Sequence, residues 1–477
     1  MLLKGDEACN PIFAPIALPC GRTLRNRLVK VALYEHLAKL FGGPPNRYHL
    51  DLYSKWSAHD WGMIFTGNVQ VSPHHLCLAR DIVLPRQLSA ENLRSFEALA
   101  TAIHGERDDK PMAIMQLSHA GRQSPNILGG RLPFVAPLGP SSIRLGSSLT
   151  NHGFISDLLH RLLFQVPQAM SSADIDDVVE AFVRGAKLAA QTGFDGVELH
   201  AAHGYLLAQF MSPKANARTD EYSCSPSNAL RLLSRIVFET RAVVPSDFIL
   251  GLKINAADYA DSSTPALDHV RTIASWGSID FIEISGGDYE KPDFLSASAS
   301  ASLRQALFAD FARDALRTVA PLPRAPLILL TGGLAAPAQL HSALSARHAH
   351  LLGLGRSAVL RPDLPQLLHD APPYATAPFA PPPDLRIGGA WVLQRLPRIR
   401  LLGAGVAMAW YVVALRRLAA VGPAVVPPDY AVGGAGGILW MWVWFGPEVE
   451  VLGMTWLYAL VLGVAAAVAG LWGVSGF

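Results

Sequence analysis

The sequence predicts an α/β fold, a (β/α)8 TIM barrel with a hydrophobic helical extension at its C-terminus. Between residues 28 and 355, eight short apolar runs alternate with longer stretches of helical period. The main alternative, a doubly wound sheet, would require a G-x-G-x-x-G turn after an early run, and the sequence has none. Charged residues become scarce only in about the last 80 residues, which places the hydrophobic extension there.

The eight apolar runs are the predicted barrel strands, because strands buried on both faces have continuous rather than alternating hydrophobic sequence. They are LVKVAL (28–33), GMIFTGNV (62–69), MAIMQL (112–117), GVELH (196–200), FILGLKI (248–254), IDFIEIS (279–285), PLILLTG (326–332) and HLLGLG (350–355).

The stretches between the runs place apolar residues three and four apart, as amphipathic helices do. Ser172 and Asp174 are candidate helix caps. The stretch 118–171 is expected to be a long non-helical insertion after the third strand, and loops of that length usually have a function. The predicted helices are 91–105, 172–193, 227–244 and 303–319.

Composition excludes some classes of function. The chain has 477 residues, and 40 basic against 38 acidic side chains leave a net charge of +2, so no overall field favours nucleic acid. The four cysteines are scattered singly, without the C-x2-C spacing of a zinc or iron–sulfur site, which favours a reducing compartment. The N-terminus has no apolar core long enough for a signal peptide, so we expect the catalytic part to stay in the cytosol.

The C-terminal part divides into a proline- and alanine-rich linker or strap, 366–395, and a hydrophobic region, 396–477. Three runs in this region, 401–415, 430–446 and 451–473, contain no charged residue, and the last is long enough to cross a bilayer as a helix. A helical hairpin packed on the barrel is the alternative. We expect a membrane anchor, with the catalytic domain facing the cytosol because arginines precede the first run; a wholly cytoplasmic protein is the alternative location.

A candidate reaction centre follows the fourth predicted strand. His200 ends that strand, and His203 and Tyr205 lie in the loop after it, on the face of a barrel where catalytic groups gather. Each residue alone could be a hydrogen-bonded histidine or a packed tyrosine at a strand end. Three such groups within six residues favour a reaction centre.

Other strand ends carry the groups that a flavin mononucleotide (FMN) would need. Gln116, at the third strand, can donate to and accept from a heterocycle with alternating carbonyl and N–H groups. Lys253, at the fifth, is a cation that needs an anion or a polarised carbonyl. The glycines of TGG (331–333) and GLGRS (353–357), with Arg356, can form a phosphate site after the last two strands.

With these residues in place, the chain resembles the Old Yellow Enzyme family of FMN-dependent ene-reductases over about 340 residues. The matching segments are RNRLVKVAL (25–33), QLSHAGR (116–122), GFDGVELHAAHGYLLAQFMSPKANARTDEY (193–222), ISGGDYE (284–290), LLTGG (329–333) and LLGLGRSAVLRPDLP (351–365). The sequence departs from the family at Tyr34, where some members place a cysteine beside the flavin, and at Ala229, where an arginine is usual.

The resemblance implies roles for individual residues. His200 and His203 would bind the carbonyl oxygen of an α,β-unsaturated substrate, and Tyr205 would protonate its α-carbon. The same resemblance implies a set of flavin contacts, with no metal ligand among them: Ala32, Asn68, Gln116, His200, Lys253, Gly333, Gly355 and Arg356.

Residues 1–365 are therefore predicted to form an FMN-binding barrel that reduces the C=C bond of enone-type small molecules, with NADH or NADPH as reductant. Two other functions remain possible at this point. One is a flavin-binding membrane scaffold without turnover, and the other is a metal-dependent barrel hydrolase that uses the histidines as ligands.

Overall fold

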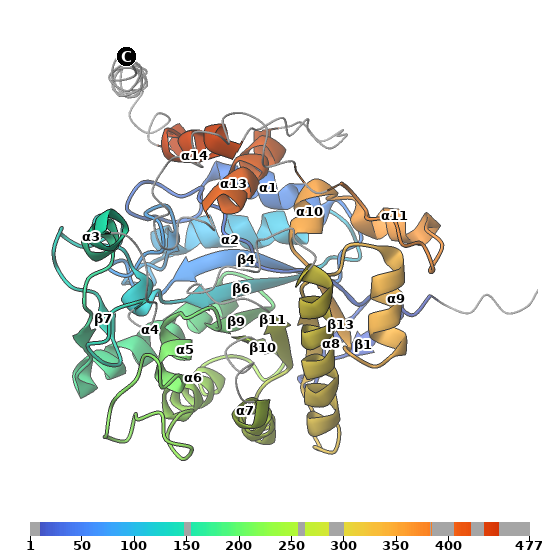
Figure 1. Cartoon of the computed structure of the whole chain (residues 1–477). Helices are drawn as coiled ribbons and strands as arrows, with labels where there is room; N and C mark the ends of the chain where they lie inside the picture. The colour runs from blue at the N-terminus through green and yellow to red at the C-terminus, as the bar shows by residue number, and fades with distance from the viewer. Residues whose placement is uncertain are drawn as a thin grey trace, which may run out of the picture.

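The computed structural model describes residues 10–146, 154–255, 263–285, 300–381, 383, 405–420 and 434–447. Eight parallel strands form a closed barrel, because β3 pairs with β13 on one side and with β4 on the other (Figure 1). All eight predicted strands are present, and closure excludes a doubly wound sheet. The barrel strands are β3 (Leu28–Lys30), β4 (Met63–Gln70), β6 (Met112–Ser118), β9 (Gly196–Ala201), β10 (Ile249–Asn255), β11 (Phe281–Ser285), β12 (Leu327–Thr331) and β13 (Leu351–Leu354).

The amino-terminal half of the barrel interior is filled by apolar side chains. The rings of Phe65 and Phe281 lie 5.4 Å apart there, in one cluster with Leu18 and Leu24 of the hairpin formed by β1 (Ile16–Ala17) and β2 (Thr23–Leu24). A Cβ on Gly251 would lie 2.0 Å from the Phe281 ring, so only glycine fits beside this ring. Polar groups are therefore concentrated at the opposite, carboxyl-terminal end of the strands.

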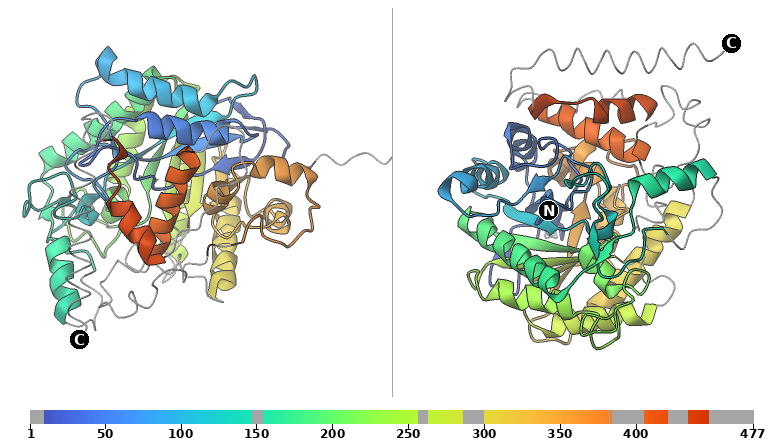
Figure 2. Two further views of the ribbon diagram at one scale, coloured as in Figure 1. Left: turned by 90° about the horizontal axis from the view of Figure 1, so that it is seen from above. Right: turned by 90° about the vertical axis from the view of Figure 1, so that its left-hand side faces the viewer.

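Helices surround the barrel and bury their apolar faces against the outside of the strands (Figure 2). The four predicted helices are present, although Ser171, not Ser172, is the N-cap of α4; Asp174 completes a capping box with it. The helices are α1 (Arg47–Ser57), α2 (Ala90–His104), α4 (Ser172–Gln191), α5 (Leu206–Met211), α6 (Arg231–Arg241), α7 (Ser263–Ser275), α8 (Ser300–Val319), α9 (Pro337–Ser345), α10 (Arg356–Leu360) and α11 (Leu364–Asp370).

The insertion after the third barrel strand differs from the prediction. It contains a ten-residue amphipathic helix, α3 (Phe154–Leu163), and a parallel pair of short strands, β7 (Leu138–Gly139) and β8 (Gln168–Ala169). The prediction of a non-helical insertion is therefore wrong for α3.

The C-terminal region contains two further helices, α13 (Gly405–Ala420) and α14 (Gly434–Trp442), which pack against each other beside α1 and α10 (Figure 1). Trp410, Val413 and Leu418 of α13 are buried in the main core. Among the described residues, no helix is long and apolar enough to cross a membrane. α13 forms part of a hairpin packed on the barrel, as the alternative prediction for this run expects, and the membrane anchor finds no support in it. The run 451–473 lies outside the described residues.

The start of the predicted linker, 366–395, also differs from the prediction. Its first residues belong to α11, and the following stretch lies along the barrel as a strap. The amides of Ala338 and Phe379 bond to the carbonyls of Ala375 and Ala335, so the strap is tied to the start of α9. Residues 384–395 lie outside the described residues.

Candidate active site

His200 and His203 meet at the carboxyl end of β9, with ring centroids 5.1 Å apart. The backbone N–H of Ala202 donates to Nδ1 of His200 over 3.3 Å, which leaves the proton of this ring on Nε2. Burial, the other histidine and Lys253 lower the pKa of His200 well below its usual value. Burial and Lys253 lower the pKa of His203 to about 3. Both rings are therefore neutral at physiological pH.

The loop that carries His203 has an unusual backbone. His203 and the next residue, Gly204, have φ angles of +55° and +71°, in the left-handed region where non-glycine residues are uncommon. Two side-chain amides hold this conformation, since Gln123 donates to the carbonyl of His203 and Gln209 to that of Gly204, each over 2.7 Å. The ring of His203 contacts Oγ of Ser285 at 3.1 Å.

Tyr205 is the N-cap residue of α5, and its ring meets that of His200 edge to face, with centroids 4.6 Å apart. Its hydroxyl oxygen accepts a hydrogen bond from Nδ2 of Asn68 over 3.2 Å and one from Sγ of Cys77 over 3.3 Å. The structure thus brings together the three predicted catalytic residues.

Four polar side chains occupy neighbouring strands inside the barrel next to His200. Nε2 of Gln116 donates to Glu198 over 2.5 Å, and Nζ of Lys253 lies 2.8 Å from Oε1 of Glu283. Burial, followed by the nearby charge of Glu283, raises the pKa of Glu198 well above its usual value. The raised pKa of Glu198 therefore favours a protonated carboxyl beside the pair formed by Lys253 and Glu283.

The predicted phosphate site lies at the ends of β12 and β13. Gly332 and Gly333 have φ angles of +123° and +72°, which only glycine adopts readily. A Cβ on Gly353 would lie 2.0 Å from Oγ1 of Thr331, so the two strand ends approach closely. Arg356 begins α10 immediately after β13, and the charge of Arg356 also acts on Tyr411 of α13.

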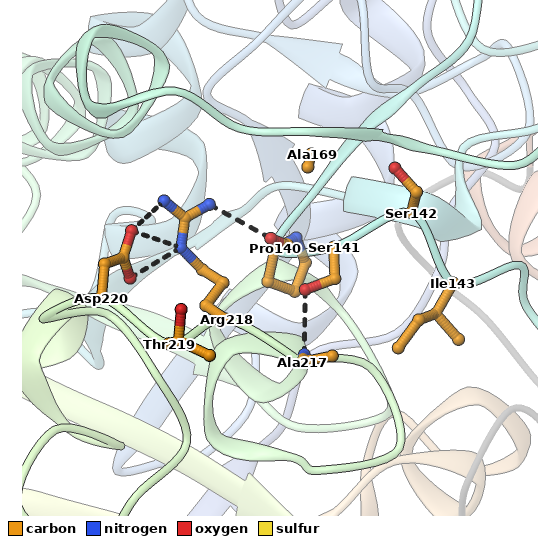
Figure 3. A pocket seen from close by; sticks show the side chains of 9 residues that line it. All are labelled: Pro140, Ser141, Ser142, Ile143, Ala169, Ala217, Arg218, Thr219 and Asp220. Atoms are coloured by element: carbon orange, nitrogen blue, oxygen red, sulfur yellow. Dashed lines mark hydrogen bonds and ion pairs between the residues drawn. The ribbon is translucent and has the colours of Figure 1, made fainter.

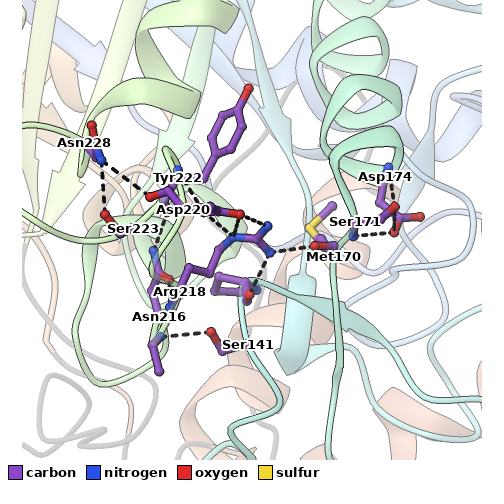
Figure 4. Close-up of polar contacts among 12 residues, drawn as sticks. Ser141, Met170, Ser171, Asp174, Asn216, Arg218, Asp220, Tyr222, Ser223 and Asn228 are labelled. Atoms are coloured by element: carbon purple, nitrogen blue, oxygen red, sulfur yellow. Dashed lines mark hydrogen bonds and ion pairs between the residues drawn. The ribbon is translucent and has the colours of Figure 1, made fainter.

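Arg218, in the ARTDEY segment, connects the insertion to the loop after β9 (Figure 4). Its guanidinium is paired with Asp220 and donates to the carbonyls of Pro140 and Met170, over 3.2 and 2.6 Å. A hollow of about 510 Å³ lies beside this arginine (Figure 3), and no predicted site residue lines it. We assign this segment a structural role, that of holding the insertion in place.

Comparison with known proteins gives the identity of the fold and its chemistry. The model of the NADH:flavin oxidoreductase / NADH oxidase family matches residues 11–372. The chain belongs to this family. It is accordingly an NAD(P)H:flavin oxidoreductase with FMN as its cofactor, and the resemblance to Old Yellow Enzyme is confirmed.

Relatives within the NADH:flavin oxidoreductase family include two fungal proteins. NADH-dependent flavin oxidoreductase iliE of Neonectria sp. (strain DH2) is 38% identical over 361 residues. The matched part is 74% of this chain and 46% of that protein, so this chain matches about half the length of that relative. NADH-dependent flavin oxidoreductase iccE of Talaromyces variabilis is 33% identical over 417 residues, 85% of this chain and 98% of that protein. The old yellow enzyme homologue from Zymomonas mobilis shares the fold, with a TM-score of 0.57 at 21% identity over 76% of this chain and 93% of that one.

The residues present fit FMN as the family's cofactor. The left-handed glycines of the β12 loop, Gly332 and Gly333, have a backbone conformation that can turn N–H groups toward a phosphate, and Arg356 begins the helix after the neighbouring strand. Because an N–H of Gln116 is used by Glu198, its amide oxygen remains to accept from the ring N–H of a flavin. Lys253 supplies a positive charge at the same end of the barrel.

Sequence reasoning missed Glu198, Glu283, Cys77 and Asp81. A signal existed for the two glutamates, since each is an acidic residue inside a largely apolar barrel run: Glu198 in GVELH, and Glu283 in IDFIEIS together with Asp280. Cys77 and Asp81 lie in an irregular loop after β4, and only the fold brings them to Tyr205.

Proposed function

We propose that this NAD(P)H:flavin oxidoreductase reduces the C=C bond of α,β-unsaturated carbonyl compounds. The observation that carries the proposal is the arrangement of His200, His203 and Tyr205, in which the rings of His203 and Tyr205 both meet the ring of His200 edge to face at one barrel end. FMN, when bound, supplies the hydride chemistry, and the residues described here bind, orient and protonate.

Neutral histidines suit the binding of a carbonyl oxygen. The Nε2–H of His200 can donate to that oxygen, with His203 beside it, and such donors stabilise the negative charge that develops on the oxygen as the alkene is reduced. The fixed loop conformation at His203 keeps this group in place before the substrate arrives.

Tyr205 supplies the proton in this proposal. Its oxygen accepts hydrogen bonds from Asn68 and Cys77, which leaves the O–H of Tyr205 in the role of donor. An ordinary phenol, with a pKa of about 10, holds its proton at neutral pH and can give it to a strongly basic carbon. The proton goes to the α-carbon and a phenolate remains, which solvent later reprotonates.

The flavin contacts are part of the same proposal. Gln116 and Lys253 would contact the pyrimidine end of the isoalloxazine, with His200 near them, and Gly333, Gly355 and Arg356 would hold the phosphate. Ala32 lies just after β3 and would face the ring system. Asn68 contacts Tyr205 in the structure, so we propose that it serves the proton donor as well as the flavin.

The test measures the rates of the two half-reactions, flavin reduction and flavin reoxidation, separately in the variant Tyr205→Phe. Anaerobic reduction of bound FMN by NADH or NADPH should stay within about twofold of the native rate. Reoxidation by a cyclic enone should slow by about 10²- to 10⁴-fold, the usual contribution of one proton donor. Tyr374→Phe is the matched control, because Tyr374 is 79% exposed. An unchanged enone rate in Tyr205→Phe would remove Tyr205 from the mechanism.

The same measurements test the two alternatives. A flavin-binding scaffold would bind FMN and show neither half-reaction at a useful rate. For a metal-dependent hydrolase, no group of three or more metal-ligating side chains occurs within the described ranges, and the family's redox chemistry favours the reductase instead.

A further inference from the structure

We propose that Cys77 is a positioning residue for the proton donor: its thiol, together with the amide of Asn68, holds the oxygen of Tyr205 and stabilises the phenolate left after protonation of the substrate. This inference rests on the role proposed above for Tyr205.

The geometry at the Tyr205 oxygen supports this role. Two donors from different segments converge on the same atom, Nδ2 of Asn68 at 3.2 Å from β4 and Sγ of Cys77 at 3.3 Å from the following loop. The ring of His200 lies edge-on beside Tyr205, and it is neutral, so it neither repels nor neutralises a phenolate. Both hydrogen bonds therefore act directly on the oxygen that would become a phenolate.

Asp81 keeps Cys77 in the form that can donate. Burial, followed by the charge of Asp81, raises the pKa of the Cys77 thiol well above its ordinary 9.0. The sulfur therefore retains its proton throughout the pH range in which the enzyme would work. A thiolate at this position would instead repel the phenolate of Tyr205.

The loop between β4 and β5 (Ile82–Val83) is built around the carboxylate of Asp81. Its Oδ2 accepts the backbone N–H groups of Cys77 and Leu78, over 3.1 and 3.3 Å, and its Oδ1 accepts from Gln70 over 3.2 Å. The amide of Gln70 also contacts Sγ of Cys77 at 3.1 Å. These bonds fix the direction of the Cys77 side chain toward Tyr205.

The proton balance needs no further reactant. The O–H bond of Tyr205 breaks, the proton and the enolate electron pair form the new C–H bond, and the negative charge moves to the phenolate oxygen. The S–H bond of Cys77 stays intact. Its hydrogen bond to Tyr205 now has an anionic acceptor, and such a hydrogen bond is stronger than one to a neutral oxygen. The stabilisation is therefore larger after proton transfer than before it.

The test compares Cys77→Ala, which removes the donor, with Cys77→Ser, which keeps one. In the FMN-loaded enzyme, enone reduction should slow about 10- to 100-fold in Cys77→Ala, as expected for the loss of one hydrogen bond to a charged group, and only a few-fold in Cys77→Ser. Flavin reduction by NAD(P)H should not change in either. Cys224→Ala is the control, because Sγ of Cys224 contacts only the carbonyl of Asn216 in the described residues. Equal losses in Cys77→Ala and Cys77→Ser would overturn the proposal.

A second readout does not depend on turnover. The protein is labelled with 13C at tyrosine Cζ and studied by NMR. The signal that is missing from the spectrum of Tyr205→Phe belongs to Tyr205, and its shift with pH reports the ionisation of this residue. Its titration midpoint should move to higher pH in Cys77→Ala and stay near the native position in Cys77→Ser. An unmoved midpoint in Cys77→Ala refutes the contact, whereas a moved midpoint in an enzyme that reduces no alkene would show that the proposed function, not the contact, has failed.

Discussion

Nζ of Lys253 lies 2.8 Å from Oε1 of Glu283 inside the barrel, and Glu198 adds a second carboxyl group to the same site. The charge of Lys253 offsets one carboxylate. A second carboxylate would leave an excess negative charge in a buried site. The site therefore keeps one carboxyl group protonated.

We predict that infrared spectroscopy will detect one buried protonated carboxyl group at pH 7, through its carbonyl stretch. In Glu283→Gln, Glu198 is the carboxyl group left beside Lys253 among the described residues, so it should lose its proton and the band should disappear. The exposed Glu239 provides the control, and Glu239→Gln should leave the band unchanged. A band that survives in Glu283→Gln would mean that burial alone keeps Glu198 protonated.

Acid should destabilise this fold at unusually mild pH. Burial lowers the folded-state pKa of five histidines in particular: His36, His49, His75, His119 and His200. Above the unfolded-state pKa of about 6.5, each of these histidines is neutral in both the folded and the unfolded state. As the pH falls below that value, the unfolded chain binds protons that the folded protein does not bind, so the free energy of unfolding falls by about 1.4 kcal/mol per pH unit for each group. Urea unfolding at pH 7.5, 6.5 and 5.5 measures this slope, and a flat profile would contradict it.

Asp81 should act in the opposite direction. Burial raises its pKa from 3.8 to about 6, so the folded protein binds a proton that the unfolded chain has released, and stability falls as the pH rises from about 4 to 6. Asp81→Asn removes this titration. Between pH 5 and 7 the stability of Asp81→Asn should therefore rise more steeply with pH than that of the native protein, by about 1–2 kcal/mol. Parallel pH profiles would argue against a raised pKa.

Arg416 of α13 is expected to stabilise the whole molecule. Its guanidinium donates to Nδ1 of His36 over 2.7 Å, to the carbonyl of Trp440 over 2.9 Å and to that of Met441 over 3.2 Å, and it lies over the Trp444 ring. Arg416→Met removes this donor from the buried His36 and Met441 and from the partly buried carbonyl of Trp440, and should lower the free energy of unfolding by about 2–4 kcal/mol.

The control for this prediction is Arg271→Ala, since Arg271 is 61% exposed and pairs only with Asp268 among the described residues. Its effect should stay below about 0.5 kcal/mol. Thermal unfolding of both variants, in the same state of FMN loading, provides the measurement. Equal stability of Arg416→Met and the native protein would show that α13 contributes little to the fold.

The barrel was predictable because buried parallel strands have a strong local signature. All eight runs are strands, and their ends correctly grouped His200, Gln116 and Lys253. The position of α13 was not predictable, because its apolar sequence suits a bilayer and a protein core equally well. The contact between Cys77 and Tyr205 depends on a loop folded around Asp81, and hydrophobic periodicity contains no information about such a loop.

The bond between Arg416 and His36 joins residues 380 positions apart in the chain. His36 belongs to the segment after the first barrel strand, next to Tyr34, which packs against α13 and α14. Contacts of such long sequence separation form late, and during synthesis the ribosome must pass Arg416 before this one can form. The segment around His36 is therefore among the last parts of the barrel to reach its final packing, and a chain that is stalled or cut before α13 would expose this segment to chaperones and proteases.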